Sequence, residues 1–266
     1  MRKLITGGLI AVLSLAVAAV ALAQNPAPTA DLKISVSPKR VGTKANPRSG
    51  RLELSAETNR AAKATASKIE IWLPKGAKLS TRGLPACSNG KINAEGAAAC
   101  PAGSKAGSGE ADALLNPNAT TPAPIKFIVT AFTGGKLNAA DAAANQFPSS
   151  MVGKEVINFH LKSDSPAVDQ ALAGVITTVR GSRTYGQKLT INIAANLQQP
   201  APGTYSALQS LETSIGLKRG NNILMKLVDC PSSRELQYQL QLTFVPNPNP
   251  PAKSKVKSTD AAACSG

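Results

Sequence analysis

Aromatic residues and histidine are scarce in this chain of 266 residues. Phe, Trp and Tyr together make up 3% of it, and His160 is the one histidine. Sheets that bind single-stranded nucleic acid carry several aromatic side chains on which bases stack, so the composition argues against that function. A single histidine also leaves little basis for a Ser–His–Asp arrangement, and the sequence contains no Gly-x-Ser-x-Gly motif.

His160 itself falls in a segment, 157–161, in which apolar residues occupy the odd positions. Such alternation is typical of a strand with one buried face. We therefore expect His160 on the solvated face, together with Asn158 and Lys162, and not in a catalytic site. A Ser–Lys dyad stays open, because its two members meet only in space.

Carboxylates are few as well. Glu53, Glu57 and Glu70 lie on the polar faces of predicted strands, near Arg51 and Lys68. Paired carboxylates at such positions could support glycoside hydrolysis, but cross-strand salt pairing explains them more simply. We predict that the protein is not an enzyme, and a secreted hydrolase on a β scaffold is the alternative.

The sequence has no Cys-x-x-Cys motif and no cluster of acidic ligands, so we expect no metal ion and no cofactor. Its four cysteines are predicted to form disulfides in an oxidising compartment. Cys87 and Cys100 are close in the chain, which favours their pairing and leaves Cys230 with Cys264. The other connectivities remain open.

The chain begins with the parts of a secretory signal peptide. Arg2 and Lys3 precede an uncharged apolar run, 4–23, that ends in small residues. We expect cleavage between Ala23 and Gln24, with retention as a membrane anchor as the alternative. No later segment is apolar enough to span a membrane, so the mature protein is predicted to be secreted, either extracellular or associated with the cell wall.

Positive charge exceeds negative charge throughout. The full chain carries a net charge of +15, and most of the excess precedes residue 106. Such a balance favours anionic partners, and we expect cell-envelope polymers or an extracellular protein. Nucleic acid is not an expected partner because the protein leaves the cytoplasm. The candidate binding surface consists of Trp72, Lys39, Arg40, Lys44 and Arg48.

Alternating apolar and polar residues, separated by Pro and Gly turns, recur along most of the chain. This pattern predicts an all-β fold, an antiparallel β-sandwich that is Ig-like or jelly-roll-like. The segment 125–132 is apolar on both faces, which suits a central strand. The alternating segments are 32–36, 52–56, 69–73, 157–161, 189–193 and 236–244.

The domain organisation follows from composition. A signal peptide (1–23) and a flexible leader (24–30) precede the sandwich domain (31–245), in which 87–124 could separate two lobes. One short helix is expected at 138–145, within a long connection. The tail, 246–266, is rich in Pro and Lys and predicted to be extended. It folds back if Cys264 pairs with Cys230, whereas an unpaired Cys264 could cross-link a self-assembling surface protein.

Five blocks make the chain similar to a group of secreted β-rich proteins of high-GC actinobacteria that have no established activity. The blocks are residues 37–43, 72–76, 100–105, 185–189 and 199–203. The resemblance implies export, β architecture and the cysteine framework, and it assigns no functional residue.

Overall fold

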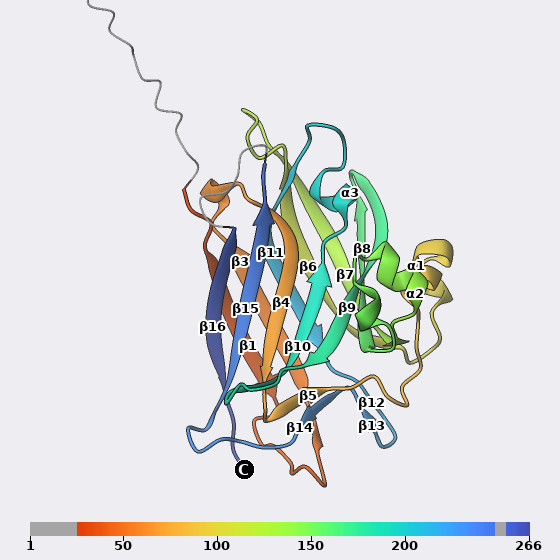
Figure 1. The fold of residues 1–266 in the computed structure, drawn as a ribbon, viewed down its shortest axis with the longest axis vertical. Coiled ribbons are helices and arrows are strands. Elements are labelled where there is room, and N and C mark those ends of the chain that lie inside the picture. Colours follow the sequence, from red (N-terminus) through yellow and green to blue (C-terminus); the bar gives the residue numbers. More distant parts are fainter. Residues whose placement is uncertain (1–25, 248–253) are drawn as a thin grey trace, which may run out of the picture.

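The computed structural model describes residues 26–247 and 254–266 of the chain (Figure 1). The predicted signal peptide, its cleavage site at Ala23 and Gln24, and most of the Pro-rich stretch 246–251 lie outside the described residues. Of the predicted leader, the structure describes 26–30, in which Ala30 already belongs to a strand. None of the helices within these limits is long and apolar enough to cross a membrane.

The described residues form sixteen strands and three α-helices, joined by three short 3-10 helices (Arg60–Ala62, Ala97–Ala99 and Ser149–Met151). The helices are α1 (Asn89–Glu95), α2 (Ala139–Ala144) and α3 (Ala195–Gln198). The strands are β1 (Ala30–Ser37), β2 (Arg48–Ser49), β3 (Arg51–Thr58), β4 (Thr65–Pro74), β5 (Ala77–Leu79), β6 (Lys105–Leu115), β7 (Ala123–Lys136), β8 (Glu155–Asp164), β9 (Ala167–Thr178), β10 (Tyr185–Asn192), β11 (Ser206–Ile215), β12 (Lys218–Arg219), β13 (Asn222–Ile223), β14 (Met225–Leu227), β15 (Glu235–Val245) and β16 (Lys255–Ala263).

Eleven strands form one antiparallel sheet in the order β1-β3-β11-β6-β7-β8-β9-β10-β4-β15-β16. The sheet curls into a nearly closed barrel, so that its edge strands β1 and β16 meet at a seam (Figure 1). There the carboxylate of Asp260 accepts a hydrogen bond from the backbone N–H of Ile34 at 2.6 Å. The all-β antiparallel prediction is confirmed. The two facing layers of the expected sandwich belong to one continuous sheet, in which β6, from the segment 87–124, lies between β11 and β7.

Alternation places the core inside this barrel. The buried positions of β1 are Leu32, Ile34 and Val36, and every second residue of β15 from Leu236 to Phe244 is likewise buried. Burial of these side chains supplies the main driving force for folding. The central strand β7 departs from the prediction in one respect: Ile128 on its outer face is 59% exposed, so that face is not covered there.

One end of the barrel is closed by a small sheet. Strands β2, β14 and β5 pair in that order across the lower end in Figure 1. Their inward side chains, among them Leu79, Met225 and Leu227, are almost completely buried. We call this the basal end, because it is the end at which β1, β4, β9 and β11 finish.

Two helices add a second layer outside the sheet, beside β8 and β9 (Figure 1). The predicted helix at 138–145 is confirmed as α2, whose N-cap Asn138 accepts a hydrogen bond from the N–H of Asp141 at 2.7 Å. The segment 88–91, whose sequence Ser-Asn-Gly-Lys is typical of a turn, instead forms the N-cap and the first residues of α1. Ser88 caps it by accepting from Lys91 N at 3.2 Å, as serine does at helix N-termini.

Both predicted disulfides are confirmed: Cys87 pairs with Cys100 and Cys230 pairs with Cys264. The second one is the pairing for which we expected the tail, 246–266, to fold back on the domain. The tail residues Lys255–Ala263 form β16, which pairs with β15 along its whole length. The tail therefore folds back on the domain and supplies the closing strand of the barrel.

Candidate functional site

The basic residues are concentrated at the basal end of the barrel. Four connections meet there, 38–50, 75–82, 179–184 and 216–234, and we call them the basal segments. They carry thirteen Lys and Arg residues and one acidic residue, Asp229. The thirteen are Lys39, Arg40, Lys44, Arg48, Lys75, Lys78, Arg82, Arg180, Arg183, Lys218, Arg219, Lys226 and Arg234.

None of these cations is paired with a carboxylate of any residue that the structure describes. Twelve of them are exposed and Lys226 is half-buried. Glu155, at the start of β8, does reach the basal segments, where its carboxylate accepts a hydrogen bond from the backbone N–H of Thr81. Lys78 and Lys226 even lie directly opposite each other on the paired strands β5 and β14. Like charges at opposed positions repel and destabilise a sheet. A bound anion would relieve that repulsion.

The predicted binding surface divides into two parts. Lys39, Arg40, Lys44 and Arg48 all belong to the first basal segment, as the front-loaded charge suggested. Trp72 does not join them, because it lies half-buried on the outer wall of β4. The ammonium group of Lys188 covers it at 5.2 Å from the ring centroid, and the same group pairs with Glu70 at 2.5 Å.

His160 is buried, contrary to our expectation of a solvated side chain. It is 5% exposed, and its Nε2 lies 2.6 Å from Oδ1 of Asp169 on the neighbouring strand. The alternation assigned the correct face, but the segment around α1 covers it: the amide of Asn158, on the same face, donates to the carbonyl of Cys87. Among the described residues, His160 forms no hydrogen bond with a Ser hydroxyl.

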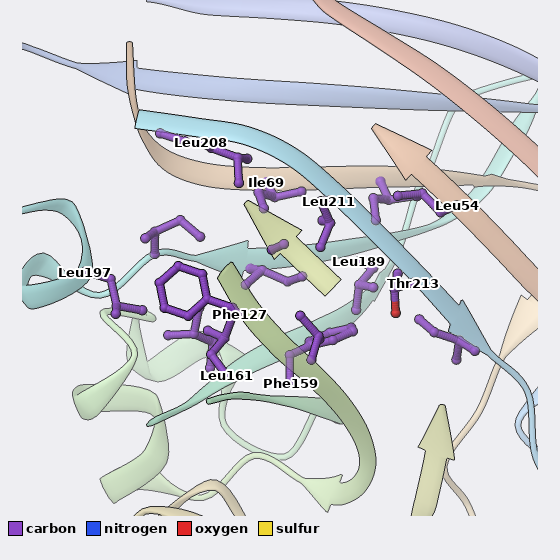
Figure 2. Close-up of a pocket in the computed structure, with 18 of the residues that line it drawn as sticks. Leu54, Ile69, Phe127, Phe159, Leu161, Leu189, Leu197, Leu208, Leu211 and Thr213 are labelled. Atoms are coloured by element: carbon purple, nitrogen blue, oxygen red, sulfur yellow. The ribbon is translucent and has the colours of Figure 1, made fainter. Parts of the chain in front are cut away.

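The barrel interior contains a cavity of about 110 Å³, which the sequence analysis missed. It is lined almost entirely by apolar side chains from nine strands and α3, including Phe127, Leu161, Leu197 and Leu208 at the end near α3 (Figure 2). Thr213 is one of its two polar residues. An empty cavity of this size costs about 3 kcal/mol relative to a filled core. Alternation marks each inner face, but it does not reveal where facing side chains fail to meet.

No family model matches the chain, and neither a curated protein nor a solved structure resembles it. The described side chains also include no group of three or more His, Cys, Asp or Glu residues that could hold a metal ion.

Tyr238 offers a direct test of the barrel interior. Its side chain is fully buried, its hydroxyl has no hydrogen-bond partner, and burial raises the pKa of that hydroxyl well above the usual value. Unfolded tyrosine ionises near pH 10, so the unfolded chain loses this proton first as the pH rises. Stability should therefore fall above about pH 10, by up to about 1.4 kcal/mol per pH unit from this residue.

Tyr238→Phe should remove that alkaline loss and raise the free energy of unfolding at neutral pH by about 1 kcal/mol, because an unsatisfied hydroxyl is no longer buried. Urea unfolding at pH 7 and pH 11 measures both effects. Tyr185→Phe is the comparison, with a smaller expected change because Tyr185 is only partly buried. An unchanged alkaline slope in the Tyr238 variant would show that this hydroxyl is accessible.

Proposed function

We propose that this protein is exported, is not an enzyme, and binds anionic polymers of the cell envelope through its basal segments. The observation that carries the proposal is the ratio of thirteen cations to one carboxylate within the four basal segments. The outer walls, in contrast, carry acidic and basic residues together. A surface of one sign attracts an extended polyanion over distances of about a Debye length.

Two further observations support the export part of the proposal. The first is the signal-peptide pattern of the sequence, with its basic head and apolar run. The second is that all four cysteines form disulfides, which persist in oxidising compartments. With Cys264 bonded to Cys230, no thiol is left for the disulfide-linked self-assembly that an unpaired Cys264 would allow.

The proposal predicts that four substitutions in one basal segment weaken binding to purified cell envelopes. Each Lys or Arg near an anionic surface contributes about 1 kcal/mol before screening by salt. Removing four should lower the affinity at least about tenfold in about 0.1 M salt. The measurement is a cosedimentation isotherm at several salt concentrations. The variant combines Lys39→Gln, Arg40→Gln, Lys44→Gln and Arg48→Gln.

A matched control removes four exposed, unpaired charges from elsewhere in the described barrel. It combines Lys33→Gln, Arg60→Gln, Lys162→Gln and Lys257→Gln. The net charge changes equally, so a specific basal surface predicts that this control binds within about threefold of the parent protein. Equal losses of affinity in the two variants would mean that binding depends on the net charge and not on a site at the basal end. Binding that is insensitive to salt would contradict the proposal that the partner is a polyanion.

A further inference from the structure

The cavity inside the barrel constitutes a second binding site, independent of the basal segments. We propose that it binds a small uncharged molecule with an apolar body and one hydroxyl or carbonyl group, and that this group hydrogen-bonds to the side chain of Thr213.

The cavity is closed towards the basal end and less tightly covered at the other. Leu73 and Leu79, near the small basal sheet, are almost completely buried. Towards α3, in contrast, Phe127, Leu197 and Leu208 are only half-buried (Figure 2). The short helix α3 lies over that end, which makes it the natural entrance for a ligand.

The size of the cavity limits what can bind. A volume of about 110 Å³ is somewhat smaller than an engineered apolar cavity of about 150 Å³ that stays dry and binds benzene. The ligand portion inside the barrel is therefore about the size of one aromatic ring or a short alkyl chain. A charged group is excluded, because no charged side chain lines the cavity and burial of an unpaired charge is very costly.

Thr213 supplies the polar contact. The residue is 8% exposed, lines the cavity, and its Oγ1 has no hydrogen-bond partner. Figure 2 shows this oxygen beside the apolar side chains of the lining. The other polar residue, Ser206, already donates its hydroxyl to the carbonyl of Leu197. A buried water needs two to four polar partners, so a ligand oxygen is a better match than water for the single free hydroxyl of Thr213.

Phenol and toluene test this proposal, because they have nearly the same shape and differ in the hydroxyl. The disulfide-bonded protein is titrated with each compound, and the methyl resonances of leucine are followed by NMR. Saturable shifts are expected for Leu161, Leu189 and Leu208, which line the cavity. Leu224 is fully buried but does not line it, so its signal should stay in place.

The Thr213→Val variant keeps the shape of the side chain and removes the hydroxyl. We expect it to weaken phenol binding about tenfold while toluene binding is unchanged or improved. Thr65→Val is the matched control, because Thr65 is also buried with an unpartnered hydroxyl and lies outside the cavity lining. That control should leave the ratio of the two affinities as it is in the parent protein.

Two results would overturn the proposal. If neither compound shifts the lining methyl groups at millimolar concentration, the cavity is not a binding site. If Thr213→Val changes the affinities for phenol and toluene by the same factor, Thr213 is not the polar contact. Should the variant fail to fold, the methyl shifts of the parent protein still decide whether the cavity binds. Envelope binding by the basal segments does not enter either measurement.

Discussion

Replacing both Cys230 and Cys264 with alanine should lower the free energy of unfolding by roughly 4 kcal/mol. The two residues are 34 positions apart, and a crosslink over a loop of that length removes a corresponding amount of entropy from the unfolded chain. The lost stabilisation should mainly affect the closing strand β16, because Cys264 directly follows it. Urea unfolding followed by circular dichroism measures it.

The double variant Cys87→Ala, Cys100→Ala is the comparison. Its loop spans 13 positions, so a smaller loss of roughly 3 kcal/mol is expected. Amide hydrogen exchange separates the two variants further. Only loss of the Cys230–Cys264 bond should speed exchange along β16 and at Ile34, whose N–H is bonded to Asp260 at the seam. Unchanged exchange at these positions would mean that the seam holds without the disulfide.

Asn145→Ala should lower the free energy of unfolding by about 3 kcal/mol, because this side chain hydrogen-bonds to a backbone N–H at the edge of a buried strand. Strand β10 pairs with β9 only between Gly174 and Thr178, so the earlier N–H groups of β9 that point away from β8 have no strand partner. Asn145 Oδ1 accepts from Ala173 N at 2.8 Å, and its amide donates to the carbonyl of Asp141 at 2.8 Å. The alanine variant leaves a buried N–H unsatisfied.

Thermal or urea unfolding of Asn145→Ala tests this expectation. Asn196→Ala provides the control, because Asn196 is exposed and its hydrogen bond to Gln170 is on the surface. Its effect should stay within about 0.5 kcal/mol. Comparable losses in the two variants would show that α2 is not attached through Asn145.

The strands could be predicted because alternation is a local property of the chain. Alternation does not predict structure that depends on a neighbouring strand. The segment 103–109 contains three glycines, a composition typical of turns, yet β6 already begins at Lys105. Gly107 and Gly109 are required because a Cβ would lie 1.8 Å from the carbonyl oxygen of Ser214 at one position and 1.9 Å from that of Glu212 at the other. Only the pairing with β11 reveals that requirement.

In the candidate sites, too, features that are local in the sequence could be predicted, whereas features that depend on distant segments could not. The first basal segment could be recognised because four of its basic residues are close in sequence. The other nine cations come from three separate connections, and the sequence alone does not bring those connections to one end. His160 was assigned to the correct face of its strand. The covering by the segment around α1 depends on a helix that local propensity did not reveal.

The seam between β1 and β16 also determines when the barrel can close. The hydrogen bond from Ile34 to Asp260 joins positions 226 apart, so it forms only after nearly all of the intervening strands are in place. Contacts between residues so far apart in sequence form slowly, because the entropy of a long loop is lost before they form. Until then the chain presents two unpaired strand edges. The unclosed intermediate is therefore the species most prone to exchange strands with another copy and to aggregate.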